Sequence, residues 1–208
     1  MGRPAKYGRD QILDAALDLV AEGGPGAVTM SAIAARLNAP TGSLYHRFGS
    51  RDLLLSALWL RSVRRFQEGF VAALEAGDAE AAALHTPRWC RAHPSEAALL
   101  LLHRRKDLVK HPGEGRDEDV NARVMAALDA YAAAHPGIDR RRLVFAVVDV
   151  PYGGVRRYLL DGRPPPALVD ELIVATCRAV LSPDPPAEPG PGKRSTDTPQ
   201  EGHVTHEK

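Results

Sequence analysis

The sequence has few cysteines: Cys90 and Cys177 are the only two in 208 residues, and they lie far apart. Small secreted domains that depend on disulfides carry more cysteines, at short spacings. The first residues also lack the apolar segment that a secretory signal requires. We therefore expect a protein of the reducing cytoplasm.

Long apolar runs are also missing. The most apolar stretches, such as residues 97–102, are shorter than the roughly 18–20 residues that a membrane-spanning helix needs. We expect a soluble protein that has no membrane partner. The net charge of +1 further argues against a protein that coats nucleic acid through its overall charge.

Motifs of catalysis and metal binding are absent as well. The sequence has no G-x-S-x-G, no H-E-x-x-H and no phosphate-binding glycine loop, since the glycines of residues 24–26 follow no predicted strand. His85, Cys90, His93 and His103 match no compact zinc motif in their spacing. We therefore predict no enzyme activity, no metal and no cofactor.

The chain does show apolar residues at helical spacing. In residues 9–23, for example, Ile12, Ala16, Leu19 and Val20 share one face, and acidic residues lie opposite. Proline, glycine and capping residues separate the segments that have this pattern. The predicted helices are residues 9–23, 30–37, 41–48, 51–76, 79–92, 95–110, 118–135, 139–161 and 166–181.

Without alternating strand patterns or internal repeats, these segments predict an all-α protein. Residues 1–50 should form an N-terminal three-helix helix-turn-helix domain, and residues 51–181 a larger C-terminal helical domain. Residues 182–208 are rich in proline, glycine and charge and poor in large apolar side chains, which predicts a disordered tail.

The two short helices, residues 30–37 and 41–48, have the dimensions of a DNA-reading helix-turn-helix. Leu44 and Phe48 would anchor the second helix, and its other side chains are mainly short and polar. Such groups suit base edges and phosphates. Thr29, at the start of the first of these helices, and Arg51, just after the second, could hold the DNA backbone.

Residues 29–37 read TMSAIAARL and residues 40–54 read PTGSLYHRFGSRDLL. Over about residues 9–55 the sequence closely resembles the N-terminal DNA-binding domain of the TetR/AcrR family of repressors. It departs from the family in two places: Arg51 stands where lysine is commoner, and residues 23–27 form a loop rich in glycine and proline. The resemblance implies that these residues contact DNA: Thr29, Thr41, Gly42, Ser43, Tyr45, His46 and Arg51.

The basic residues Arg3, Lys6 and Arg9 leave two interpretations open. They could form an arm beside the DNA, or they could belong to a frayed, solvated terminus.

One such domain reads only a few base pairs, so useful affinity requires a dimer on a palindromic operator. The resemblance implies a homodimer formed by the last two helices, residues 139–161 and 166–181. Their apolar stripes could instead close the core of the monomer. The residues of these stripes are Leu143, Val147, Val150, Leu168, Leu172, Ile173 and Val180.

The resemblance also implies a pocket for a small-molecule effector in the C-terminal domain. The candidates, each of which could instead serve ordinary core packing, are Trp59, Phe66, Trp89, His103, Tyr131, Phe145, Asp149 and Tyr152. Residues 149–154, with one proline and two glycines, should kink their helix. This segment could line the pocket or let two helices pack closely at the dimer interface.

The leading hypothesis is therefore a ligand-responsive repressor that binds double-stranded DNA and is released by a small molecule of unknown identity. The main alternative is a helical small-molecule-binding protein that no longer reads DNA, and an enzyme is the least favoured. The polar surface predicted for residues 41–48 argues against the main alternative.

Overall fold

The computed structural model describes residues 7–103 and 120–182. These residues form helices and no strand, so the predicted all-α class is confirmed. The helices are α1 (Arg9–Gly23), α2 (Met30–Leu37), α3 (Thr41–Phe48), α4 (Arg51–Glu75), α5 (Ala79–Ala92), α6 (Pro94–Leu102), α8 (Ala122–Ala134), α9 (Arg140–Val144), α10 (Val150–Leu160) and α11 (Ala167–Leu181).

The predicted helix bounds are close to those observed. Four predicted helices, residues 9–23, 30–37, 41–48 and 79–92, agree residue for residue with α1, α2, α3 and α5. The predicted helix 95–110 is α6, which ends at Leu102, and residues 104–110 lie outside the described residues. Arg3 and Lys6 of the possible basic arm also lie outside the described residues, as does the chain beyond residue 182.

Side-chain caps explain where three helices begin. The hydroxyl oxygens of Thr29 and Ser50 and a carboxylate oxygen of Asp78 each accept a hydrogen bond from the backbone N–H three residues later, at 3.0, 3.1 and 2.8 Å. These bonds satisfy N–H groups that have no partner within the helix. Asn38 ends α2 in the left-handed conformation, with φ of 47°.

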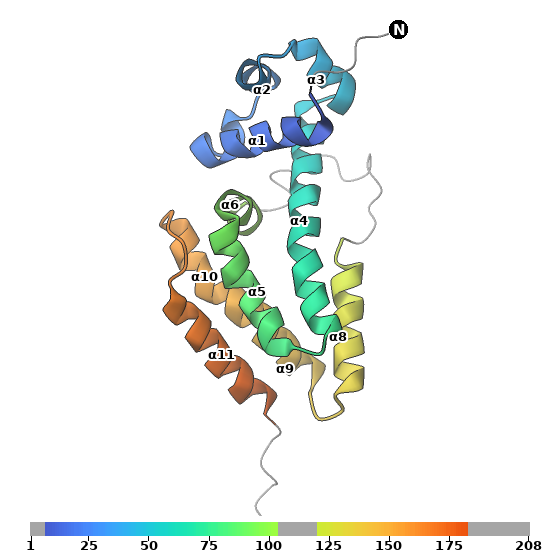
Figure 1. The fold of residues 1–208 in the computed structure, drawn as a ribbon, viewed down its shortest axis with the longest axis vertical. Helices are drawn as coiled ribbons and strands as arrows, with labels where there is room; N and C mark the ends of the chain where they lie inside the picture. The colour runs from blue at the N-terminus through green and yellow to red at the C-terminus, as the bar shows by residue number, and fades with distance from the viewer. Residues whose placement is uncertain (1–6, 104–119, 183–208) are drawn as a thin grey trace, which may run out of the picture.

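Helices α1–α3 form a head at one end of the molecule, and α4 runs from this head along the body (Figure 1). The core of the head includes Ile12, Ile33 and Leu44, but it does not end at residue 50. Leu58 of α4 and Leu99 of α6 are also buried in it. Two helices of the body therefore complete the core of the head.

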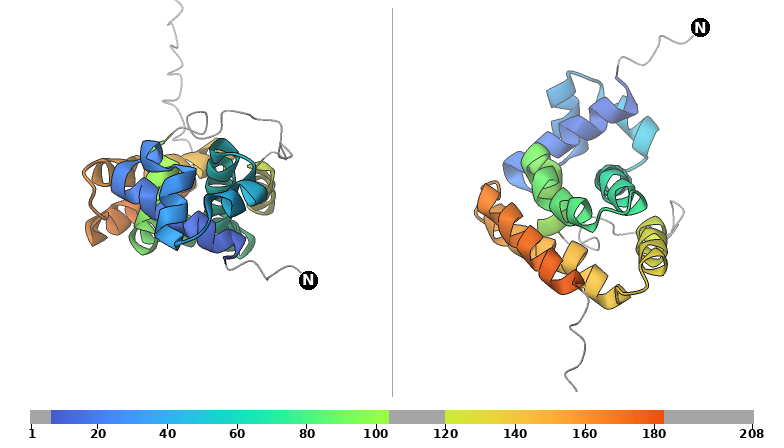
Figure 2. Two further views of the ribbon diagram at one scale, coloured as in Figure 1. Left: turned by 90° about the horizontal axis from the view of Figure 1, so that it is seen from above. Right: turned by 60° about the horizontal axis from the view of Figure 1, so that its bottom comes forward.

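The body is built around α4 and α5. Helix α8 lies on one side and α10 and α11 lie on the other, as two views agree (Figures 1 and 2). Its core contains Phe70, Leu128, Leu143, Val147 and Ile173, which come from α4, α8, α9, the following turn and α11.

The predicted interruption of the 139–161 helix takes the form of a π-helical turn at residues 145–149, directly before Pro151. Such turns interrupt the regular hydrogen bonding of an α-helix. Beyond it, Gly154 faces α11: a Cβ at this position would lie 3.5 Å from Cγ1 of Val169. This contact joins α10 and α11 of one chain, so close packing at a dimer interface remains a prediction for this segment.

Candidate nucleic-acid interface and ligand cavity

Helix α3 is held to the head by two side chains and exposes the rest of its surface. Leu44 is 1% exposed and Phe48 is buried beside it, whereas Tyr45 is 51% exposed and His46 is exposed. The guanidinium of Arg9 lies 4.7 Å from the centre of the Phe48 ring. Arg9 thus packs on the base of α3.

The first turn of α3 presents a low, open surface. Gly42 is exposed, and a Cβ built on it would meet no atom within 4 Å. The hydroxyl of Ser43 donates a hydrogen bond of 2.7 Å to the carbonyl of Pro40, which fixes the start of the helix. Thr41 is partly buried beside them. The absence of a side chain at residue 42 lets another molecule approach the helix backbone closely.

Thr29 lies at the start of α2, where its hydroxyl oxygen caps the helix. The same oxygen lies 3.1 Å from the hydroxyl of Ser31. The two hydroxyls and the first N–H groups of α2 form an exposed cluster of hydrogen-bonding groups. A helix N-terminus of this kind suits a phosphate oxygen.

Arg51 lies at the start of α4, but its guanidinium turns toward the protein. It donates hydrogen bonds of 2.5 Å to the carbonyls of Val28 and Pro25, and a third of 3.2 Å to Asp52. Arg51 thus closes the glycine- and proline-rich loop before α2. The sequence analysis missed this structural role, although both unusual features, the arginine and the loop, were visible in the sequence.

Ion pairs tie α1 to its neighbours. Arg36 of α2 donates a hydrogen bond of 2.5 Å to Glu22 of α1, and this bond lowers the pKa of the Glu22 carboxyl. Arg61 of α4 lies 2.8 Å from a carboxylate oxygen of Asp14 in α1. These pairs orient α1 against both the helix-turn-helix and the long helix of the body.

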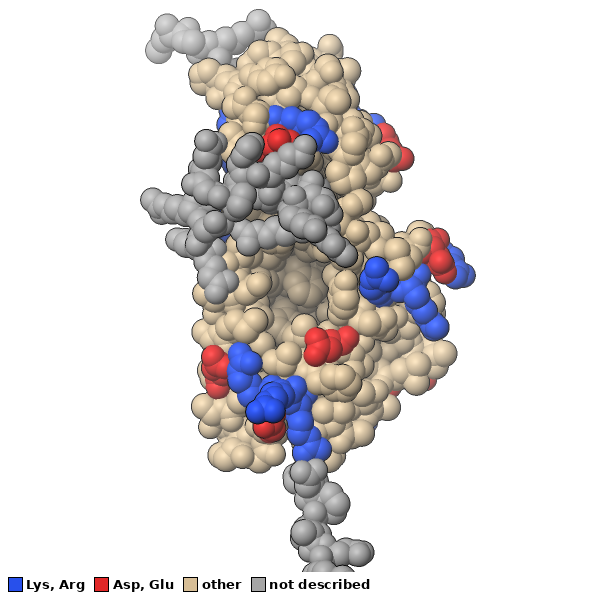
Figure 3. Space-filling model, turned by 180° about the vertical axis from the view of Figure 1, so that it is seen from behind, with Lys and Arg blue, Asp and Glu red and all other residues tan. Residues whose placement is uncertain are grey.

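An open cavity of about 360 Å³ lies in the body, lined by side chains of α4, α5, α6, α8 and the helix from α9 to α10. The face drawn in Figure 3 is hollowed in its middle, where the floor shows neither basic nor acidic side chains. The described lining residues are Trp59, Val63, Phe66, Gln67, Phe70, Thr86, Trp89, Leu100, Leu101, Asn121, Val124, Met125, Leu128, Val144, Val147, Val148 and Tyr152.

Four of the eight ligand-binding candidates meet in this cavity: Trp59, Phe66, Trp89 and Tyr152. The rings of Phe66 and Trp89 touch edge to face, with their centres 5.2 Å apart. Three helices, α4, α5 and α10, therefore bring aromatic side chains to one place.

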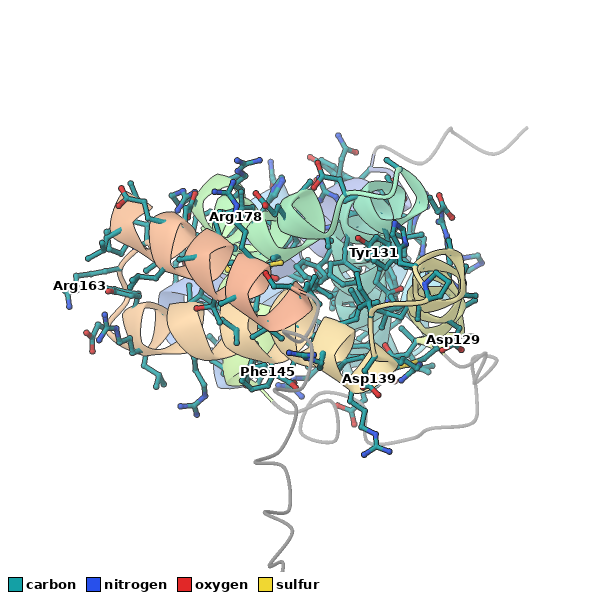
Figure 4. The ribbon with its side chains drawn as sticks, turned by 90° about the horizontal axis from the view of Figure 1, so that it is seen from below. Asp129, Tyr131, Asp139, Phe145, Arg163 and Arg178 are labelled. Atoms are coloured by element: carbon teal, nitrogen blue, oxygen red, sulfur yellow. The ribbon has the colours of Figure 1, made fainter. Side chains whose placement is uncertain are left out.

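The other four candidates lie elsewhere. Tyr131 is buried and stacks on His135, with ring centres 4.1 Å apart, and His103 follows the end of α6 without lining the cavity. Phe145 is 48% exposed and Asp149 is exposed. Figure 4 shows Tyr131 and Phe145 well apart. Tyr131 lines a second cavity, of about 460 Å³, between α5, α8 and α11. Ligand binding by His103, Phe145 and Asp149 remains a prediction without support from their positions.

Three polar lining residues, Gln67, Thr86 and Asn121, were not among the candidates. Gln67, which is largely buried, donates a hydrogen bond of 3.3 Å from Nε2 to Oδ1 of Asn121. A glutamine on the apolar face of the predicted fourth helix was the feature of the sequence that could have pointed to it.

His85 supports the cavity from behind. Its Nε2 hydrogen-bonds the carbonyl of Phe66 at 2.8 Å, and its ring lies 4.9 Å from the Phe66 ring, centre to centre. Burial lowers the pKa of His85. The imidazole is therefore neutral at pH 7 and donates its Nε2 proton to the carbonyl.

The predicted dimerisation stripe is divided by the fold. Leu143, Val147 and Ile173 are buried in the core of their own chain, as the alternative interpretation held for them. In contrast, Leu168 is 56% and Leu172 is 57% exposed. Val150 and Val180 are partly buried.

Two further observations concern the described residues alone. No group of three or more His, Cys, Asp or Glu side chains there is placed to hold a metal ion. Likewise, no helix in residues 7–103 or 120–182 is long and apolar enough to cross a membrane.

Comparison with known proteins gives matches at the level of family and fold. Residues 12–58 match the family model of bacterial regulatory proteins, tetR family. No protein with a curated description matches the sequence.

Solved structures match most of the chain. A TetR-family transcriptional regulator from Streptomyces coelicolor is 24% identical, with a TM-score of 0.55 over 83% of this chain and 96% of that one. The fatty acid degradation regulator FadR from Bacillus halodurans is 19% identical, with a TM-score of 0.64 over 85% and 97%. FadR from Bacillus subtilis, in complex with stearoyl-CoA, is 17% identical, with a TM-score of 0.62 over 84% and 98%.

At these identities the solved structures establish a shared fold, and the family model covers the head. Residues 12–58 therefore match the N-terminal domain of the tetR family of bacterial regulatory proteins, and the described helices share the fold of solved TetR-family regulators.

Proposed function

We propose that this protein is a cytoplasmic transcriptional repressor that binds a palindromic operator as a homodimer and releases it when a small molecule occupies the body. The observation that carries the proposal is the exposed, mainly uncharged surface of α3 on a head that matches the tetR family model. An enzyme is not proposed, because the described site offers recognition groups without a catalytic arrangement.

In the proposed complex, α3 enters the major groove. Thr41, Gly42 and Ser43 lie nearest the bases, and Tyr45 and His46 contact phosphates or base edges. Thr29 meets the backbone at the start of α2. For Arg51 the inward hydrogen bonds support an indirect contribution: the side chain fixes the loop that positions α2.

The proposed dimer forms through the outer faces of α10 and α11. Leu160, Leu168 and Leu172 are exposed there, and pairing with a second copy would remove them from water. Two copies related by a two-fold axis would present two α3 helices to successive half-sites.

The cavity supports the ligand-responsive part of the proposal. It is aromatic, largely apolar and of a size suited to a small organic molecule. A protein of the same fold, FadR from Bacillus subtilis, holds stearoyl-CoA. Release of DNA requires that the ligand bind the two conformations of the dimer with different affinities.

The test is selection of duplexes from a random DNA pool by the purified full-length protein. We expect a palindrome whose half-sites are spaced by about one helical turn or a multiple of it. Affinity for this duplex should fall steeply with salt, because phosphate contacts release counterions. Tyr45→Ala should weaken binding about tenfold, whereas Arg163→Ala, an exposed change in the body, should leave it unchanged.

Recovery of no preferred sequence would refute DNA recognition. If the same preparation still bound small molecules, the main alternative, a ligand-binding protein that does not read DNA, would replace the proposal.

A further inference from the structure

Aromatic side chains are concentrated in the cavity. Both tryptophans of the chain line it, together with two of its four phenylalanines and one of its five tyrosines. Aromatic rings give large contact areas and favour edge-to-face or offset packing against other rings. This concentration favours a ligand that is itself aromatic.

The described lining carries no Lys, Arg, His, Asp or Glu. A charged ligand group buried among these residues would lose its hydration without gaining an opposite charge. Cation–π attraction could offset part of this cost for a cation, but an anion has no such compensation. The lining therefore favours an uncharged ligand.

One polar position interrupts the apolar wall. Gln67 donates one N–H of its side-chain amide to Asn121. A second N–H and the side-chain carbonyl oxygen remain as groups with which a ligand can form hydrogen bonds. An amide in the ligand would match this donor and acceptor pair. Thr86 adds a hydroxyl to the lining of the cavity.

The volume limits the size of the ligand. A cavity of about 150 Å³ is known to accept benzene, so 360 Å³ has room for about two such rings. The same scale gives about 25 Å³ for each carbon, or roughly 14 carbons in all. A stearoyl chain, with 18 carbons, would extend beyond the volume that the described residues line.

We infer that the effector is an uncharged molecule of about two aromatic rings with one amide-like hydrogen-bonding group that meets Gln67. The inference rests on the proposed function only in naming this ligand an effector. Its binding is a property of the cavity and can be measured without DNA.

Three probes of the same shape separate the possibilities: biphenyl-4-carboxamide, biphenyl-4-carboxylate and the biphenyl-4-yl-trimethylammonium ion. Trp59 and Trp89 are the only tryptophans and both line the cavity, so tryptophan emission of the full-length protein reports on this site alone. Calorimetry provides a second measure of binding. We expect the carboxamide to quench the emission and to bind at least 30-fold more tightly than either charged probe.

Gln67→Leu tests the hydrogen-bonding group. It should weaken the carboxamide about 2- to 10-fold and leave the affinity for unsubstituted biphenyl unchanged, since biphenyl has no amide to lose. Unchanged biphenyl binding also shows that the variant keeps a folded cavity. Equal loss of affinity for both probes would refute the contact with Gln67.

Tighter binding of the carboxylate, the cation or stearoyl-CoA than of the carboxamide would overturn the inferred ligand class, whether or not the protein recognises an operator. If the carboxamide binds but leaves the affinity for a selected operator unchanged, the inferred ligand class of the cavity stands and its role in regulation is refuted. The two proposals therefore fail in different measurements.

Discussion

The contact between α4 and α5 behind the cavity depends on Gly69. A Cβ on this residue would lie 2.5 Å from Cε1 and 2.9 Å from Nδ1 of His85. The imidazole cannot move away cheaply, because its Nε2 is bonded to the Phe66 carbonyl and its ring packs on the Phe66 ring. Gly69→Ala should therefore destabilise the protein, although alanine is the better helix former.

Two opposing effects set the magnitude. Overpacking of this kind costs about 1–3 kcal/mol, and the helix propensity of alanine returns up to about 1 kcal/mol. We expect a net loss of about 1–2 kcal/mol, or a decrease of roughly 2–8 °C in Tm for a chain of this size. Urea unfolding at a fixed protein concentration, followed by circular dichroism, measures it.

The decisive control is the same substitution in a His85→Ala background. With the ring gone the new methyl group meets no clash, so Gly69→Ala should stabilise that background by about 0.5–1 kcal/mol. The two changes should thus be coupled by about 2 kcal/mol. Equal destabilisation in the two backgrounds would refute the explanation that the imidazole excludes a side chain at residue 69.

Gly42→Arg should leave the circular dichroism spectrum and Tm unchanged, because nothing lies within 4 Å of the added Cβ. The same change should abolish sequence-specific binding of DNA in a gel-shift assay. Normal folding with unchanged operator affinity would contradict the placement of α3 in the groove. The double substitution Leu168→Asp and Leu172→Asp places two charges on the exposed apolar face of α11. In sedimentation velocity this variant should be a folded monomer. A persistent dimer would place the interface elsewhere. Burial lowers the pKa of His85, so at low pH the unfolded chain binds a proton that the folded chain excludes. The free energy of unfolding should therefore fall as the pH drops through about 6.5, the ordinary pKa of histidine. His85→Gln keeps a donor for the Phe66 carbonyl and should flatten this part of a stability–pH curve, so an unchanged slope would exclude His85 as its origin. Burial raises the pKa of the Cys90 thiol to about 12. A thiol-specific chromogenic disulfide at pH 8 should therefore label Cys90 orders of magnitude more slowly in the native protein than in denaturant. Equal labelling rates would mean that Cys90 is accessible in the native protein.

The head could be predicted closely from the sequence because its determinants are local. The caps at Thr29 and Ser50 lie beside the helices that they start, and Leu44 and Phe48 are one turn apart on the same helix. Each of these features acts within a few residues of the chain. The bounds of α2 and α3 follow directly from them.

The cavity could be predicted only in part because its wall is assembled from distant segments. Helical periodicity shows that Trp59 and Tyr152 belong to apolar segments. The packing of both α4 and α10 against α5 and α6 decides that the two side chains meet one cavity. The π-helical turn at residues 145–149 changes the phase of its helix, so Phe145 faces outward while Val148 and Tyr152 line the cavity. No local pattern in the sequence reveals that change of phase.

Arg51 shows a different limit. A basic residue at the start of the fourth helix resembles a phosphate contact, but its partners are two backbone carbonyls more than 20 residues earlier. Their positions depend on how the loop of residues 23–28 folds, and side-chain identity does not encode that. The role of Arg51 therefore becomes clear only when the loop and helix are seen together.

Two helices link the cavity to the DNA-binding head through neighbouring residues. In α4, Leu58 is buried in the core of the head and Trp59 lines the cavity, and in α6, Leu99 is buried in the same core while Leu100 and Leu101 line the cavity.

Protein cores are packed too closely to absorb displacement of one such residue without moving the next. A ligand that shifts Trp59 or Leu100 must therefore act on the core that supports α1 and α3. The energy available is limited by the difference in ligand affinity between the two conformers, and each tenfold difference supplies about 1.4 kcal/mol toward reorienting the heads. Leu58 and Leu99 connect the cavity wall directly to the core of the head. The release of DNA that we propose therefore requires no longer chain of contacts across the body.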